Sequence, residues 1–282
     1  MNRRIVLVAV VAIAVAVAIA VTLSSTLASS RKTVYPGYPK IPGSSPHSNP
    51  LIPASSPAAS VMIPAPSPGG NAINRPRNTL YSKNWSGYTA ISTARGAFWQ
   101  VKSTWIEPSV SCSGSSPWQM ESAWVGLDGA NSTTVEQLGT YGQCLNGVVS
   151  HRAWYEMYPA YQVNLSGTVL PGDHLTAEVN RSGDSYTLTI ADSTRHWSHV
   201  IHRSGSFKDT SAEAIMEAPY SGGILPLADF HTAHFTRTKI NGGARTTIYA
   251  VDMVNASNTA YLDTVSSVTG GGAWSAYWDR SR

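Results

Sequence analysis

Charged residues are scarce in this sequence, and acidic residues are missing from its first part. Asp, Glu, Lys and Arg make up 13% of the 282 residues. This is about half of the usual share in soluble domains, which excludes a polyelectrolyte or a charge-laced helical protein. Residues 1–77 contain seven Lys or Arg and no Asp or Glu, so the basic charge of the chain belongs to this part. Residues 78–282 hold thirteen basic and sixteen acidic residues, a mildly acidic balance that argues against nucleic acid as a partner.

Several catalytic signatures are also absent. The sequence has no His-Glu-x-x-His metal motif and no Gly-x-Ser-x-Gly serine elbow. Because serine is common in this sequence, residue spacing alone does not exclude a catalytic serine triad. An aspartic protease needs two copies of its Asp-containing catalytic loop, and the sequence does not contain such a pair. His196, His199 and His202 are spaced by three in a strand-like stretch, where they alternate between faces, so we interpret them as surface or packing residues.

The first 77 residues divide into an apolar segment and a proline-rich segment. Uncharged, mostly apolar residues 5–23 follow two arginines, a pattern typical of a signal peptide and near the length that spans a bilayer. Residues 1–28 are therefore either a cleaved signal peptide or a retained membrane anchor, and both alternatives export the rest of the chain. Eleven of the seventeen prolines lie between residues 36 and 76, so residues 29–77 are interpreted as a linker or pro-segment.

Residues 78–282 carry the signals of one β-rich domain. All nine tryptophans and all four phenylalanines lie there, enough for a sizeable core. Residues 161–165, 185–190 and 247–251 are rich in β-branched and aromatic side chains, which favours strands. No twelve-residue window has a convincing helical period. We predict an all-β antiparallel sandwich or barrel.

The chain has two cysteines, Cys112 and Cys144. In an exported protein they most simply form one disulfide, and two unpaired thiols are the alternative. A cysteine nucleophile is not expected, because one thiol would have to stay reduced outside the cell.

Three glutamates lie in apolar stretches: Glu156, Glu213 and Glu217. Glu213 and Glu217 are four residues apart and share one face of a strand or a helix. Either these carboxyl groups are desolvated, which makes them candidate acids or bases, or they face solvent from the outside of a sheet. The pattern leaves both alternatives open. Gln137 is, by spacing, an ordinary strand residue.

Six segments, taken in order, resemble the glutamic peptidases of family G1, the eqolisins. The resemblance covers roughly residues 84–265. It is carried by Asn84-Trp-Ser-Gly-Tyr88, residues 105–108, Ser122-Ala-Trp-Val-Gly-Leu-Asp-Gly129, Val135-Glu-Gln-Leu-Gly139, residues 153–159 and residues 212–217. It implies a lectin-like, concanavalin A-like β-sandwich of two antiparallel sheets, in agreement with the strand pattern.

The resemblance also implies a catalytic pair, with Gln137 at the position of the catalytic Gln and Glu217 at that of the catalytic Glu. In such a site the glutamate takes a proton from water and returns it to the leaving amine. The glutamine amide holds the water and donates a hydrogen bond to the oxyanion. No metal and no cofactor is then required, and an acidic working pH is the natural hypothesis. Four further residues are expected to shape the site: Trp85, Trp124, Glu156 and Glu213.

The sequence thus predicts an exported, monomeric acid endopeptidase that acts on proteins or peptides and binds no nucleic acid. It would be secreted, or tethered to the membrane by residues 5–23, with residues 78–282 outside the cytoplasm. Two alternatives stay open. One is a non-catalytic carbohydrate-binding sandwich, since sugars stack on Trp and Tyr and fold alone does not decide function. The other is a glycosidase that uses Glu156 and Glu217 as a carboxyl pair.

Overall fold

The computed structural model describes residues 52–53, 79–112, 116–221 and 223–282. All of them belong to one compact unit, residues 39–282, and a second unit, residues 1–38, lies outside the described residues. The expected signal peptide or anchor, and all but two residues of the expected linker, are therefore outside the described part as well. Among the described residues, no helix has the length and apolar character needed to cross a membrane.

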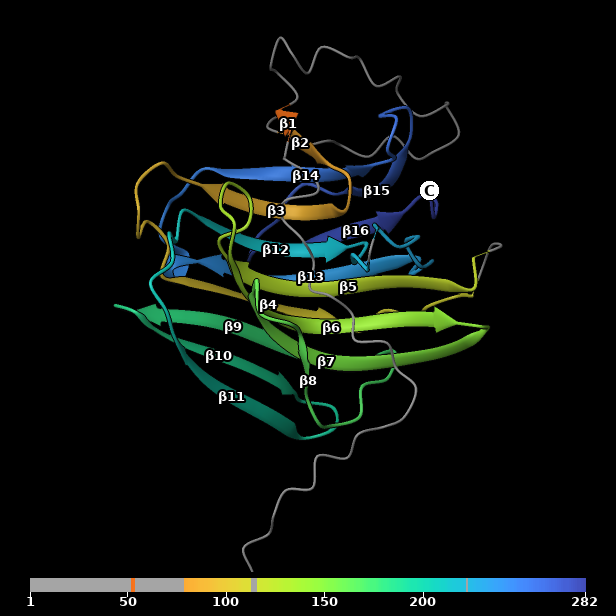
Figure 1. Ribbon diagram of the computed structural model, residues 1–282, viewed down its shortest axis with the longest axis horizontal. Helices are drawn as coiled ribbons and strands as arrows, with labels where there is room; N and C mark the ends of the chain where they lie inside the picture. Colours follow the sequence, from red (N-terminus) through yellow and green to blue (C-terminus); the bar gives the residue numbers. More distant parts are fainter. Residues whose placement is uncertain (1–51, 54–78, 113–115, 222) are drawn as a thin grey trace, which may run out of the picture. The chain divides into compact units, whose positions relative to one another are not determined.

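Strands account for nearly all the regular structure that the described residues form (Figure 1). The exception is a short 3₁₀ turn, η3 (Asn241–Gly243). The prediction of an all-β fold is confirmed. The strands are β1 (Ile52–Pro53), β2 (Thr79–Ser82), β3 (Trp85–Ile91), β4 (Gln100–Ile106), β5 (Trp118–Leu127), β6 (Val135–Leu145), β7 (Val148–Tyr158), β8 (Val163–Asn164), β9 (His174–Ser182), β10 (Ser185–Asp192), β11 (Trp197–Ser204), β12 (Ser211–Glu217), β13 (Thr232–Ile240), β14 (Ile248–Val254), β15 (Tyr261–Val265) and β16 (Trp274–Trp278).

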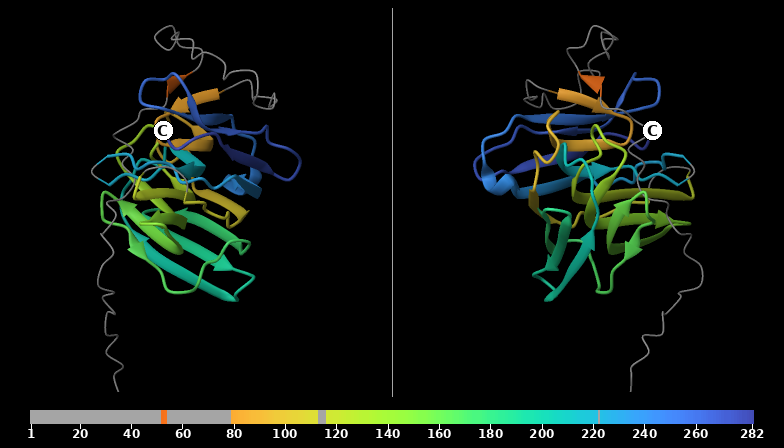
Figure 2. Two further views of the ribbon diagram at one scale, coloured as in Figure 1. Left: turned by 90° about the vertical axis from the view of Figure 1, so that its right-hand side faces the viewer. Right: turned by 60° about the vertical axis from the view of Figure 1, so that its left-hand side comes forward.

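The strands form two layers joined by one continuous hydrogen-bonded path. Its order is β11-β10-β9-β4-β13-β16-β15-β14-β3-β12-β5-β6-β7-β8, so β15 bridges the layers by pairing with both β14 and β16. Figure 2 shows β9–β11 lying in a different layer from β5–β7. All pairs of named strands are antiparallel except β2 with β14, which is parallel. The expected sandwich is present, with its two sheets linked at one side.

The main core fills the space between the layers. Strands β9 and β10 alternate buried and exposed residues, as a half-buried strand must. Leu188 and Ile190 on β10 point inward with Leu175 on β9, and all three are fully buried. Fully burying one such side chain stabilises a fold by about 1.5–3 kcal/mol. Strands β5, β6 and β12 are buried on both faces instead, so their outer face is also covered.

The three segments that sequence pattern assigned to strands had different outcomes. Residues 185–190 lie within β10 and residues 248–251 within β14, as predicted. Within residues 161–165 only Val163 and Asn164 pair as a strand, β8, and both are exposed. Leu165 packs against the main core, and its N–H donates to the Ala153 carbonyl at 2.9 Å, but Tyr161 and Gln162 lie outside the strand.

Cys112 and Cys144 form a disulfide, as expected, and join positions 32 residues apart. A cross-link of this span stabilises a fold by about 3–4 kcal/mol in the chain-entropy estimate, because it restricts the unfolded chain. We expect the double variant Cys112→Ser/Cys144→Ser to lose about this much free energy of unfolding. Urea unfolding followed by circular dichroism measures it, and a loss below about 1 kcal/mol would show that the unfolded chain is restricted by other means.

Candidate active site

The candidate site lies on the face of β5, β6, β7 and β12 that points away from the main core. Antiparallel register places Gln137 on β6 between Gly126 on β5 and Glu156 on β7. It places Glu217 on β12 opposite Ser122 on β5. Because side chains two residues apart share a face, all these side chains project to the same side. The structure therefore brings both residues of the expected catalytic pair onto one sheet face.

Glu217 is the last residue of β12, and its carboxyl group is held by two neutral donors. Asn84 donates from Nδ2 to Oε1 at 3.0 Å, and Trp124 donates from Nε1 to Oε2 at 2.9 Å. The residue is 1% exposed. It borders a pocket of about 10 Å³, roughly the smallest space that holds one water molecule. The pocket is lined by Met120, Ser122, Tyr141, Trp154, Gln162, Glu217 and Pro219.

Gln137 and Glu156 are paired neighbours across β6 and β7. The Gln137 amide donates from Nε2 to Glu156 Oε2 at 2.6 Å, and both side chains are fully buried. Burial, together with the charge of Glu217, raises the pKa of Glu156 to about 8, and the Gln137 hydrogen bond partly offsets this. Glu156 therefore carries a proton in acid, and its contact with Gln137 fixes the orientation of the amide plane.

Trp124 lies at the centre of this face, and two glycines make room for it. A Cβ atom at Gly139 would come within 2.6 Å of Trp124 Cβ, and one at Gly126 within 2.9 Å of the indole ring. The indole also meets the ring of Trp85 edge-on, with the centroids 5.1 Å apart. This packing aims the indole N–H of Trp124 at Glu217. Trp85 thus contacts the site through Trp124.

Glu213, the other glutamate expected to shape the site, is fully buried in the row of Gly126 and Gln137. Its Oε1 accepts a hydrogen bond from Thr89 Oγ1 at 3.3 Å. Burial raises its pKa well above the ordinary value. The alternative that the three glutamates face solvent is thereby excluded, because Glu156 and Glu217 are buried too.

Buried carboxyl groups make the stability of this fold depend on pH. Burial, followed by the charge of Asp128, raises the pKa of Glu136 to about 10, and that of Glu156 is raised to about 8. A raised pKa means that the folded protein retains protons that the unfolded chain releases above its ordinary value of 4.5. The stabilisation is complete below that value and is lost as the pH rises through the raised values. We expect the melting temperature to be highest in acid and to fall from about pH 4.5 to about 10.

A pH series of thermal melts at constant ionic strength tests this expectation. Glu136→Gln should flatten the alkaline part of the decline, because the amide keeps the shape of the protonated carboxyl group without titrating. A wild-type melting temperature that rises between acid and neutral pH would contradict it.

Asn84 is a site residue that sequence reasoning did not select, although it begins the first resembling segment. Its contact with Glu217 joins residues 133 positions apart, and no local spacing signals such a pair. Ser122 was missed for the same reason. It accepts a hydrogen bond from Trp154 Nε1 at 3.2 Å and donates to the Thr140 carbonyl at 2.7 Å, next to the pocket.

A larger hollow, of about 600 Å³, lies elsewhere, along β13 and β16. His234, Trp274 and Tyr277 are among its lining residues, and it contains none of the expected site residues. The volume of a pocket therefore does not by itself identify the active site. The small pocket at Glu217 is the better candidate, because it adjoins a buried carboxyl group with two oriented donors.

The fold and the site together define a class of protein. An all-β sandwich that holds a buried carboxyl group beside space for one water, with a fixed amide on the same face, has the groups of a water-activating hydrolase. The chain belongs to the Peptidase A4 family, whose sequence signature matches residues 83–275. It is thus an enzyme of the glutamic peptidase, or eqolisin, group.

The comparison with solved structures found similar proteins, three of which follow. Scytalido-glutamic peptidase with a peptide-based transition state analog is 25% identical, with a TM-score of 0.59 over 70% of this chain and 98% of that chain. SCP-B, an eqolisin in complex with the tripeptide Ala-Ile-His, is 24% identical, with a TM-score of 0.56 over the same shares. Aspergilloglutamic peptidase from Aspergillus niger is 27% identical over 57% of this chain and 99% of that chain, with a TM-score of 0.48. No curated protein sequence matches.

These findings confirm the family, the sandwich fold and the enzyme class that the sequence predicted. The family and the disulfide also point to a location outside the cytoplasm. The roles of the individual site residues stay predictions.

Proposed function

We propose that this protein is an exported endopeptidase that cleaves peptide bonds in acid with Glu217 and Gln137 as its catalytic residues. The observation that carries the proposal is the arrangement around Glu217. Trp124 and Asn84 orient the carboxyl group at a pocket with room for one water. Gln137 lies on the same face with its amide fixed by Glu156.

In the proposed reaction, Glu217 removes a proton from the bound water while the water oxygen attacks the carbonyl carbon of the scissile peptide. The carbonyl oxygen becomes an oxyanion, which accepts a hydrogen bond from the Gln137 amide. Glu217 then returns the proton to the leaving nitrogen, and the carbon–nitrogen bond breaks to give a carboxylic acid and an amine. Each atom and proton is accounted for by peptide, water and Glu217.

Two features support acid as the working condition. Glu156 and Glu213 remain uncharged only below their raised pKa values, so the sheet face that holds the site is most stable in acid. With its pKa raised to about 8, Glu156 is protonated in acid and adds no negative charge beside Glu217.

The peptidase proposal is tested by digestion of a denatured protein with the purified full chain over a pH series. We expect cleavage in acid that resists pepstatin, a metal chelator and a serine-directed inhibitor. Cleavage confined to neutral pH, or abolished by the chelator, would refute the proposed mechanism. The carbohydrate alternatives predict retention on a glycan column, or glycan hydrolysis, in place of peptide cleavage.

The organisation of the chain also remains a proposal. We propose that residues 78–282 form the peptidase domain, that residues 29–77 are a linker or pro-segment, and that residues 1–28 are a signal peptide or anchor. The family match, residues 83–275, supports the first of these boundaries. Terminal sequencing of the secreted form, together with its partition between membrane and medium, distinguishes a cleaved signal from an anchor.

A further inference from the structure

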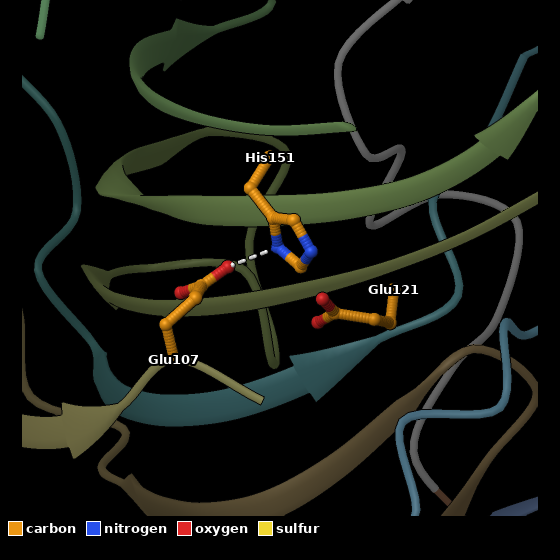
Figure 3. Close-up of side chains that lie close together, drawn as sticks. All are labelled: Glu107, Glu121 and His151. Atoms are coloured by element: carbon orange, nitrogen blue, oxygen red, sulfur yellow. Dashed lines mark hydrogen bonds and ion pairs between the residues drawn. The ribbon is translucent and has the colours of Figure 1, made fainter. Parts of the chain in front are cut away.

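A second buried polar cluster lies on the opposite face of the same strands. It consists of Glu107, just after β4, Glu121 on β5 and His151 on β7 (Figure 3). Glu121 directly precedes Ser122, which faces the active-site pocket, so its side chain points the other way, toward the main core. The cluster is therefore separate from the proposed catalytic pair.

The three side chains converge although they come from distant parts of the sequence. Glu107 Oε1 lies 2.8 Å from His151 Nδ1. Glu107 Oε2 accepts hydrogen bonds from Thr140 Oγ1 at 2.6 Å and from Trp105 Nε1 at 3.4 Å. Figure 3 shows the two carboxyl groups approaching the imidazole from different sides. Thr140 and Trp105 thus hold Glu107 in place, and Glu107 in turn orients the imidazole ring.

Two members of the cluster have polar atoms with no hydrogen-bond partner among the described residues. These are both carboxyl oxygens of Glu121 and Nε2 of His151. Glu121 is fully buried, and the His151 side chain is only 2% exposed. Buried polar atoms in proteins are nearly always hydrogen-bonded, because an unpaired one costs about 1–3 kcal/mol. Such a set of unpaired donors and acceptors points to a bound ion or water as their partner.

The space that these side chains occupy depends on a glycine. Gly142 on β6 lies between Glu121 and His151 in the register of the three strands. A Cβ atom at Gly142 would come within 2.4 Å of Glu121 Oε1 and within 2.9 Å of His151 Cε1. A larger residue at this position would displace the Glu121 carboxyl group or the imidazole from their present positions. This makes the cluster a built feature of the sheet.

Charge also favours a cation in this place. Two carboxylates and one neutral imidazole would together leave two negative charges in the core, which is costly without a counter-charge. A divalent ion supplies that charge and satisfies the unpaired atoms.

We propose that Glu107, Glu121 and His151 bind one divalent transition-metal ion of the zinc class. One ligand atom from each residue lies within 4.8 Å of the other two. Ligands around a tetrahedral zinc ion are roughly 3.4 Å apart, given bonds of about 2.0–2.1 Å, so modest side-chain movement closes the site. An imidazole donor beside two carboxylates suits zinc or cobalt better than calcium or magnesium. The ion would act as a structural link between the loop after β4 and strands β5 and β7.

The test measures metal binding directly, with the full chain purified without a histidine tag and treated with a chelator. Zn²⁺ is titrated by calorimetry near pH 7, and Co²⁺ is added as a spectroscopic probe, both to the folded protein and during refolding. We expect one ion per chain, visible ligand-field bands from bound Co²⁺, and a higher melting temperature with Zn²⁺.

Matched variants locate the ion. Glu121→Gln keeps the size of the side chain and is expected to weaken binding by about 100-fold or more, and Gly142→Ala should weaken it by crowding the ligands. Glu136→Gln is the control, because Glu136 is also a buried glutamate without a hydrogen-bond partner among the described residues, on the core-facing side of β6. The control should bind the ion normally, and melting curves in chelator verify that each variant folds.

Three results would overturn the proposal. The first is wild-type protein that binds neither Zn²⁺ nor Co²⁺ in any of these preparations. The second is binding that Glu121→Gln leaves unchanged. The third is binding that only Glu136→Gln removes, which would place the ion at the other acidic group, Asp128, Glu136 and Asp209.

Discussion

Replacing Glu217 with Gln is expected to lower kcat/KM for peptide hydrolysis by roughly 10³- to 10⁴-fold, the upper range for loss of general acid–base catalysis. The same group is proposed both to take the proton from water and to return it to the amine, so one substitution removes both steps. The Gln side chain keeps the size of the carboxyl group. It has one acceptor oxygen, so it cannot satisfy both Trp124 and Asn84, which now share the two oxygens.

The assay for Glu217→Gln is a steady-state measurement of peptide cleavage in acid, with circular dichroism and thermal melts on the same preparation. Glu136→Gln is the matched control, because it makes the same chemical change at another buried glutamate, on the opposite face of the sheet. It should retain near-normal activity. A folded Glu217→Gln enzyme within about tenfold of wild type would show that another group activates the water.

Replacing Gln137 with Ala is expected to lower kcat by about 10²- to 10³-fold, the typical cost of losing one oxyanion donor. The loss should appear in kcat and kcat/KM alike, because the amide stabilises charge that develops only in the transition state. KM should change little. Glu156 loses its amide donor in this variant but remains protonated in acid, so a large collapse of the fold is not expected.

Gln143→Ala provides the comparison for Gln137→Ala. Gln143 lies on the same strand and is also buried, but its hydrogen bonds go to Trp118 and Ser150. Near-normal turnover by this variant, beside a strong loss in Gln137→Ala, would separate the amide's role in the transition state from its role in packing. If Gln137→Ala raises KM and leaves kcat intact, the amide contributes substrate binding only.

The enrichment of short segments in β-branched and aromatic residues, without a helical period, was enough to predict the β class. It failed at residues 161–165, where the composition favours a strand but the segment is exposed. The disulfide could be predicted because the chain has two cysteines. The layer-bridging role of β15 was not predictable, since the pairing of one short strand with both β14 and β16 depends on long-range geometry.

The candidate site was predictable in part. Glu217 and Gln137 were found through resemblance, and pattern alone gave no reason to select Gln137. Whether the glutamates faced solvent or the interior could not be decided from sequence, because both faces of β12 turned out to be buried. His151 was not predicted, because spacing along the chain does not reveal its neighbours. The register of β5, β6 and β7 brings Glu121 to it, and Glu107 reaches it from just after β4.

The linkage of both layers into one hydrogen-bonded path has a consequence for self-association. A sandwich built from two separate sheets has four edge strands, and each unpaired edge can template the addition of another chain. Here the described path ends at β11 and at β8, a strand of two residues. β11 ends in the exposed residues His202, Arg203 and Ser204, which disfavour pairing with a second molecule. For a protein with so few charged residues to keep molecules apart, linking the two sheets leaves fewer edges at which a second molecule can pair.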